Sequence, residues 1–212
     1  MAHAPTIAPP QQEHRIAMTY EEWVAWPDTD SKQTEWVDGE AIFFMPPETV
    51  HALMSFFVAR LLGDFVDLFD LGLVIPTPFE MRLERSAREP DILFIAASHL
   101  DRLTPERLMG PADLAIELIS DDSTTRDRRD KYREYAEAGV PEYWLLDPRP
   151  DRRRADFFGL TADNTYEPIS PDAAGRVHSR VLPGFWLDPA WLWQEPLPKP
   201  AALLALIAPV RP

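Results

Sequence analysis

ADLAIELIS, residues 112–120, is a short apolar run that carries two acidic residues. In an extended chain successive side chains point to opposite faces, so Asp113 and Glu117 share one face while Leu114 and its alternate neighbours share the other. An ionised carboxylate inside a protein is costly unless a cation, a metal or several hydrogen-bond donors compensate its charge. The stretch therefore predicts a buried strand with a compensating group near Glu117. We expect Asp113 at the open end of the strand, solvated or paired, outside that site.

The composition predicts one substantial hydrophobic core. The chain has 212 residues, of which 45% are hydrophobic and 11% aromatic. This size suits a single domain, which we expect over residues 18–193, with a mobile leader at 1–17 and a Pro-rich C-terminal tail at 194–212. The 35 acidic residues against 21 basic ones give a net charge of −14, which opposes a broad basic surface for nucleic acid.

The sequence contains no cysteine, and we expect no secretory signal. Without cysteine there are no disulfides and no thiolate metal sites, which fits a reducing compartment, and the cytoplasm is the expected location. The N-terminus lacks the pattern of a secretory signal. The apolar run at 201–210 is too short to span a bilayer, so we expect a soluble protein with no membrane segment.

Local signals in the first third of the chain predict a helix, a hairpin and a second helix. Thr19 is a candidate N-cap, with Glu22 placed for a capping box. The pair Asp38-Gly39 predicts a tight turn between two strands. Residues 49–69 have apolar positions at three- and four-residue steps, which predicts an amphipathic helix that covers a sheet and ends near Gly72.

The remainder of the chain predicts a mixed α/β fold. Strand patterns and a helix between them follow in order: strands at 79–85, 89–97 and 112–120, a helix at 123–138 closed by Gly139, a strand at 142–148, and shorter antiparallel strands at 154–160, 165–170 and 176–184. The unit from 112 to 147 predicts a right-handed parallel crossover. That crossover would bring its helix back over Glu117, within a mixed sheet flanked by helices.

The predicted site begins with the acids of two strands. Asp91 opens the apolar strand at 89–97, which could lie beside the strand of Glu117. Magnesium prefers oxygen ligands and usually accepts one or two carboxylates, so Asp91 and Glu117 could converge on Mg²⁺, or on Mn²⁺. Glu35 could join them as an accessory acid from the hairpin.

The helix at 123–138 supplies cations. Asp127, Lys131 and Tyr135 recur every four residues and form one stripe. If this stripe faces Glu117, Lys131 could orient the attacking water or hold a phosphate, although it could also simply pair with Asp127. The same helix carries three candidate phosphate contacts, Arg126, Arg128 and Arg129.

Several stretches, taken in order, resemble one protein family. They are EWVDGE, His51 at the head of a helix, EPDILFI, DLAIELIS, DRRDKYREYAEAGVPEYWLLDP and LPGFWLDPAWLW. The set is similar to the Uma-two family, endonuclease-like proteins of the PD-(D/E)XK nuclease superfamily, and covers the chain from Met18 to Trp193. The resemblance implies a restriction-endonuclease-like core with flanking helices and magnesium-dependent hydrolysis of phosphodiester bonds in DNA.

The resemblance also assigns roles by position. Asp91 matches the PD aspartate, and Glu117 matches the acidic residue of the (D/E)XK element. The chain departs from the pattern two residues later, where Ile119 stands in place of the strand lysine. Lys131 would have to replace that lysine from the following helix.

Two alternatives to the nuclease stay open. Glu117 could form a buried salt bridge with Lys131 that needs no metal, and the protein would then be a catalytically inactive module of the same fold that binds nucleic acid or protein. A hydrolase of small phosphorylated molecules would suit the acidic surface, but no glycine-rich phosphate loop is present.

Two further expectations concern packing. We interpret His51 as a partly buried core histidine. We expect a homodimer because the Trp-rich C-terminal region offers apolar surface.

Overall fold

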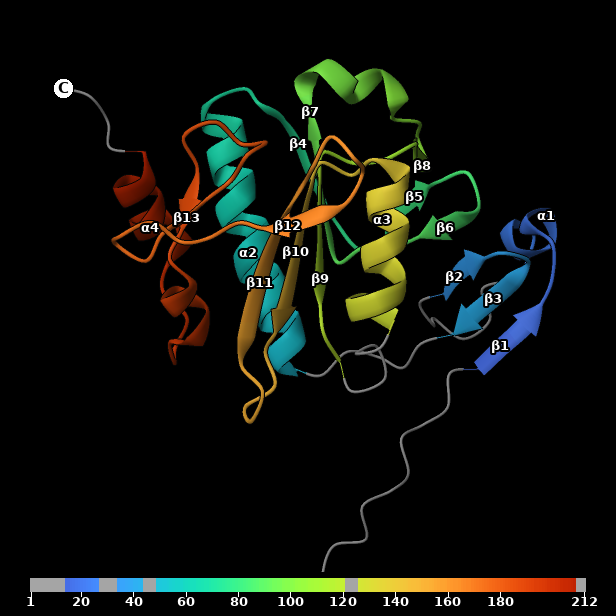
Figure 1. Ribbon diagram of the computed structural model, residues 1–212, viewed down its shortest axis with the longest axis horizontal. Helices are drawn as coiled ribbons and strands as arrows, with labels where there is room; N and C mark the ends of the chain where they lie inside the picture. The colour runs from blue at the N-terminus through green and yellow to red at the C-terminus, as the bar shows by residue number, and fades with distance from the viewer. Residues whose placement is uncertain (1–13, 27–33, 44–48, 121–125, 209–212) are drawn as a thin grey trace, which may run out of the picture.

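A computed structural model describes residues 14–26, 34–43, 49–120 and 126–208. Within these residues the chain forms two six-stranded mixed sheets, a two-stranded ribbon and four α-helices (Figure 1). The first sheet has the order β1 (His14–Ala17), β3 (Glu40–Phe43), β2 (Thr34–Val37), β6 (Ser86–Arg88), β5 (Glu80–Arg82), β8 (Arg107–Met109). The second has the order β12 (Tyr166–Pro168), β11 (Arg154–Leu160), β10 (Glu142–Asp147), β9 (Leu114–Leu118), β7 (Ile92–Ala96), β4 (Gly72–Pro76). The ribbon pairs β13 (Val177–His178) with β14 (Trp186–Leu187).

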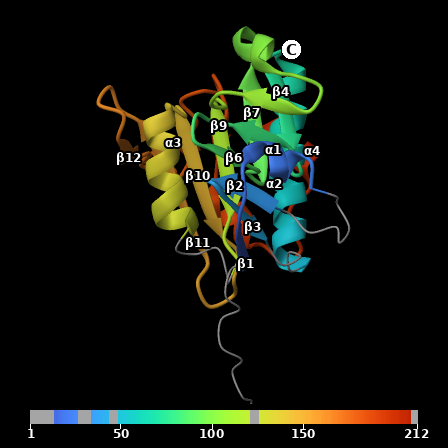
Figure 2. The same ribbon diagram turned by 90° about the vertical axis from the view of Figure 1, so that its right-hand side faces the viewer.

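Two of the four α-helices cover the second sheet, one on each face. The α-helices are α1 (Tyr20–Val24), α2 (Thr49–Leu68), α3 (Tyr132–Ala138) and α4 (Pro200–Ile207). Short helical turns lie at η1 (Ala97–Arg102), at the π-helical η2 (Arg126–Lys131), which leads into α3, and at η3 (Pro189–Trp193). Figure 2 shows α2 and α3 on opposite faces of the second sheet. The mixed α/β architecture predicted from the sequence is confirmed.

Strand β9 divides the core in the alternating way that its sequence predicts. Leu114 and Ile116 belong to a hydrophobic cluster with the buried face of α2, and Ala115 belongs to a second cluster with Tyr135 of α3. Strand β9 runs parallel to β10 and antiparallel to β7. The strand–helix–strand unit therefore returns α3 over the face of β9 that carries Glu117.

Two local predictions match the structure at the level of single residues. Asp38 and Gly39 both have positive φ, 47° and 89°, which is the geometry of the tight turn between β2 and β3. The Thr19 side chain caps α1, and the Glu22 side chain returns to the Thr19 backbone, which completes the capping box.

Gly72 plays a different part from the one predicted. Helix α2 ends at Leu68, and Gly72 is the first residue of β4, a strand that the sequence analysis did not identify. A Cβ atom on Gly72 would lie 2.0 Å from the Ile95 carbonyl oxygen, so only glycine permits this approach of β4 to β7. The glycine thus signals close strand packing rather than the end of a helix.

Helix α2 is long and apolar enough to span a membrane by length and composition alone. Phe57, Val58 and Phe65 on its inner face are almost fully buried against the sheet. This packing makes α2 a core helix.

The predicted leader and tail both contain ordered structure. Residues 14–17 form β1, which pairs with β3, whereas residues 1–13 lie outside the described part. Within 194–212, α4 places Leu203 and Ile207 in the same hydrophobic cluster as α2. Leu203 and Ile207 therefore pack on the hydrophobic core, although the C-terminal stretch that contains them is rich in proline.

Candidate functional site

Charged side chains from both sheets and from the helices gather where β7 begins and β9 ends. The antiparallel register pairs Ile92 with Ile116, so one further step along both strands sets Asp91 opposite Glu117. Strands β2 and β6 of the first sheet and helix α3 supply the other charged side chains of this region. Figure 1 shows α3 next to β9, with the first sheet on its other side.

Glu117 is buried and compensated by two side chains of the helix that follows it. Its Oε1 accepts hydrogen bonds from Lys131 Nζ at 2.8 Å and from the Tyr135 hydroxyl at 2.7 Å. Only 3% of Glu117 and 3% of Lys131 is exposed. Burial, followed by the charges of Glu117 and Glu35, holds the pKa of Tyr135 well above its ordinary value, so its hydroxyl stays protonated and donates.

Glu35 shares the same lysine. Lys131 Nζ lies 2.9 Å from Glu35 Oε1, and Arg88 Nη1 donates to Glu35 Oε2 at 2.9 Å. Arg88 in turn binds both carboxylate oxygens of Glu134 on α3. Burial alone would lower the pKa of Arg88, but Glu35 and Glu134 raise it well above the ordinary value. The two sheets are thus joined through alternating acids and cations, all of them buried except the half-buried Glu134. We call Glu35, Arg88, Glu117, Lys131 and Glu134 the charge cluster.

Glu89 adds a further acid that sequence reasoning did not single out. Its backbone N–H donates to Glu35 Oε1 at 3.2 Å. Burial, together with repulsion from Glu35 and Glu80, raises the pKa of Glu89 to about 7, against the opposing effect of Lys131. In the sequence, the signal that could have identified Glu89 is its position directly before Pro90 in EPDILFI. Arg88 was also missed, although an arginine in a strand of small residues indicates a buried partner.

Asp91 has a different set of neighbours from Glu117. Asp91 Oδ2 accepts a hydrogen bond from the backbone N–H of Leu118 at 2.7 Å, and Oδ1 lies 3.4 Å from Nε2 of His51. The same His51 nitrogen is 3.1 Å from the Leu118 carbonyl oxygen. The strand register sets the positions of Asp91 and Glu117 opposite each other, while the Asp91 carboxylate contacts the main chain of β9 and His51 of α2.

Asp113 lies at the opposite end of β9 from Glu117. It accepts a hydrogen bond from the Ala96 N–H at 2.7 Å and pairs with His99 Nδ1 at 2.8 Å. Placement at a paired strand end is what we expected for this residue.

The three arginines proposed as phosphate contacts differ in their surroundings. Arg128 is held by Asp156 at 2.9 Å and lies 3.5 Å from Asp147, so it is engaged with protein acids. Arg129 is exposed. The side chains of Arg126 and of Asp127, the first member of the predicted stripe, lie outside the described part of the chain.

The donor chemistry of this region fits a hard divalent cation. Carboxylates of Asp91 and Glu117 and the carbonyl of Leu118 are oxygen donors, and Mg²⁺ is commonly held by one or two carboxylates together with water. Among the described residues no group of three His, Cys, Asp or Glu side chains is arranged to hold a metal.

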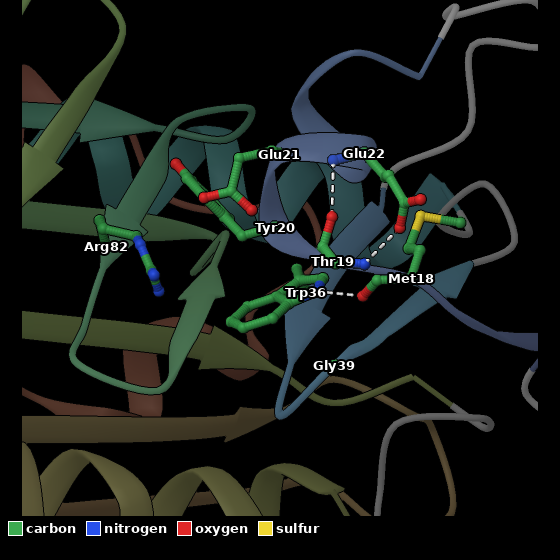
Figure 3. A pocket seen from close by; sticks show the side chains of 8 residues that line it. All are labelled: Met18, Thr19, Tyr20, Glu21, Glu22, Trp36, Gly39 and Arg82. Atoms are coloured by element: carbon green, nitrogen blue, oxygen red, sulfur yellow. Dashed lines mark hydrogen bonds between the residues drawn. The ribbon is translucent and has the colours of Figure 1, made fainter.

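A hollow of about 540 Å³ lies on the other side of β2 from the charge cluster (Figure 3). Its lining residues are Met18, Thr19, Tyr20, Glu21, Glu22, Trp36, Gly39 and Arg82. Adjacent strand residues point to opposite faces, so Trp36 faces away from the side that Glu35 occupies. The Arg82 guanidinium, which is among the lining residues, lies 4.1 Å from the centre of the Tyr20 ring. We do not include the hollow in the candidate site.

The fold and the acid-and-lysine arrangement define a restriction-endonuclease-like protein. The model of the Uma2 (Uma-two) family, described as "Putative restriction endonuclease", matches residues 20–190, and the chain belongs to this family. A crystal structure from Anabaena variabilis, described as a "putative nuclease belonging to DUF820", is similar in fold, with a TM-score of 0.67 and 18% identity over 83% of this chain and 97% of that one. A comparison with curated protein sequences found no match. Family and fold together support a nuclease.

Proposed function

We propose that the protein is a metal-dependent endonuclease that hydrolyses phosphodiester bonds of DNA, with Mg²⁺ as the ion and Mn²⁺ as a substitute. Membership of the Uma2 family supports this function. The observation that carries it is the register of β7 and β9, which sets Asp91 opposite Glu117 beside a buried lysine. Asp91 and Glu117 are the proposed metal ligands.

When bound, a divalent ion would lower the pKa of a coordinated water and polarise the phosphate. Lys131 would stabilise the charge that develops on the phosphate oxygens. Glu35 would keep Lys131 in place when Glu117 turns to other partners, because the same ammonium already contacts both carboxylates. Tyr135 would keep Glu117 oriented through its hydroxyl.

Lys131 takes the role that the superfamily pattern gives to a strand lysine. Ile119, at the pattern position, is 1% exposed and packs in the hydrophobic cluster beside α3. The ammonium of Lys131, at the junction of η2 and α3, reaches Glu117 instead, which supports a functional migration of the lysine from strand to helix.

DNA, the homodimer and the cytoplasm belong to this proposal. Arg129 is available for a phosphate, whereas Arg128 would have to leave its acids first. The C-terminal tryptophans on which the homodimer expectation relied are used within the protein, since Trp191 is buried and Trp186 and Trp193 pack against the core. Sedimentation measurements test the homodimer independently of activity.

The alternative is a catalytically inactive nucleic-acid or protein-binding module. Lys131 contacts both Glu117 and Glu35, and Arg88 also pairs with Glu35, so these two acids have two cations beside them without a metal. Calorimetric titration with Mg²⁺ or Mn²⁺ separates the two functions, because an inactive charge pair should bind neither ion with useful affinity.

Cleavage of supercoiled plasmid DNA with Mg²⁺ or Mn²⁺ tests the proposal. The wild type should nick or linearise the plasmid, and Asp91→Ala and Glu117→Ala should each abolish the reaction while remaining folded. Glu106→Ala, which changes an acid with a 78% exposed side chain, is the matched control and should retain activity. Persisting metal-dependent cleavage by both purified site variants would rule out the assignment.

A further inference from the structure

His51 on α2 contacts two groups at the end of β9. Its Nε2 lies 3.1 Å from the carbonyl oxygen of Leu118 and 3.4 Å from Oδ1 of Asp91. The His51 side chain is 12% exposed and that of Asp91 13%, so solvent competes only weakly for these contacts. A histidine that served only as core packing would not need two oxygen partners on one nitrogen.

The two partners determine where the hydrogen is. A carbonyl oxygen and an ionised carboxylate can only accept, so Nε2 of His51 must carry a hydrogen and donate it. One N–H can be shared between two acceptors, and the longer distance to Asp91 is consistent with that sharing. Because both partners accept hydrogen bonds, we assign the Nε2–H tautomer to His51.

The backbone of Leu118 contacts both Asp91 and His51. Its backbone N–H donates to Oδ2 of Asp91 at 2.7 Å, while its carbonyl oxygen faces His51. Both oxygens of Asp91 are therefore oriented, one by β9 and one by α2. Leu118 directly follows Glu117, so the same contacts determine the position of Asp91 relative to the second proposed ligand.

Helix α2 is a rigid support for this contact. Its buried residues Val58, Leu61 and Leu62 are each at most 2% exposed and pack on the second sheet. An imidazole has two rotatable side-chain bonds, and His51 is anchored at the first turn of this packed helix. Precise placement of ligands depends on such supporting contacts.

We propose that His51 is a positioning residue that holds the Asp91 carboxylate and the Leu118 carbonyl in the arrangement a divalent cation requires. This inference rests on the proposed function, because it assumes that Asp91 binds an ion. His51 does not touch the reacting atoms. Its contribution is a directed N–H that limits rotation of Asp91.

Calorimetric titration of the full chain with Mn²⁺ tests the role of His51. We expect His51→Ala to weaken Mn²⁺ binding about tenfold or more, as is typical when a group that orients a ligand is removed. His51→Gln, which can place an N–H near the same oxygens, should recover most of the affinity. His51→Phe, which keeps a ring but donates no hydrogen bond, should bind as weakly as His51→Ala and serves if the alanine variant does not fold.

His99→Ala is the matched control, because it breaks a His–Asp contact of 2.8 Å at the other end of β9. It should bind Mn²⁺ as the wild type does. Wild-type affinity in folded His51→Phe or His51→Ala, or a glutamine variant no better than phenylalanine, would overturn the positioning role. Failure of the wild type itself to bind Mn²⁺ would instead overturn the proposed function, and the inference with it.

Discussion

Lys131 Nζ lies 2.8 Å from Glu117 Oε1, and both side chains are buried. The lysine comes from the helix that follows the strand of Glu117, and the parallel crossover to β10 brings that helix back over the strand. A buried acid in ADLAIELIS is thus matched by a buried cation fourteen residues further along the chain.

Lys131→Met should destabilise the protein strongly. The substitution keeps much of the side-chain volume but leaves Glu35 and Glu117 without their shared cation. Breaking a buried ion pair from one side costs about 3 to 5 kcal/mol, which urea unfolding would detect. Arg133→Met on the same helix removes an exposed cation and should change stability by less than about 0.5 kcal/mol. Equal stability of the two variants would show that the buried lysine is not required for charge compensation.

Arg88→Met tests the other half of the charge cluster. Arg88 is 3% exposed and binds Glu35 and Glu134, so its loss should cost about 3 to 5 kcal/mol of unfolding free energy. Arg85→Met, three residues earlier, removes an arginine whose side chain is 79% exposed and pairs with Asp38. Its effect should stay below about 1 kcal/mol in the same urea titration. A small effect of Arg88→Met would mean that Glu35 and Glu134 are compensated by other groups.

Tyr135→Phe should cost about 1.5 to 3 kcal/mol, because it removes a hydrogen bond to the charged Glu117. Tyr132→Phe on the same helix removes a hydrogen bond to a neutral carbonyl and should cost about 1 kcal/mol. Thermal or urea unfolding of the two single variants gives the comparison. The reverse order would contradict an ionised Glu117 in the resting protein.

Asp172 gives a pH-dependent prediction away from the site. A hydrogen bond from His178 and backbone N–H donors lower the pKa of Asp172 from 3.8 to about 2. Since the folded pKa is below the ordinary value, the contribution to stability is present above pH about 4 and is lost as pH falls toward 2. Carboxyl NMR should show this low pKa in the wild type and a higher one in His178→Ala. An unchanged pKa in the variant would show that His178 is not the main cause.

Much of the fold follows from local sequence signals. The capping box at Thr19, the turn at Asp38-Gly39 and the alternation within residues 112–120 each depend on nearby residues, and each matches the structure. Strand β4 and helix α4 were missed, because each is defined by distant contacts. Gly72 is needed for a close approach to β7, and Leu203 is buried by the core that contains α2.

The candidate site was predictable as a set of residue types rather than as a network. The sequence indicates Asp91 and Glu117 through acids that interrupt apolar strands, and Lys131 through its helical spacing. It does not show that Arg88 of β6 would pair with Glu35 of the neighbouring strand β2, nor that His51 of α2 would turn toward Asp91. Such contacts depend on which strands pair and on how a helix packs on its sheet, which no local pattern encodes.

Anomalous diffraction from a crystal soaked in manganese chloride tests the central claim most directly. The account predicts one anomalous peak at the end of β7 and β9, about 2.1 Å from a carboxylate oxygen of Asp91 and from one of Glu117. A soaked crystal with no peak there, or with a peak that touches only one of the two carboxylates, would contradict a shared metal site.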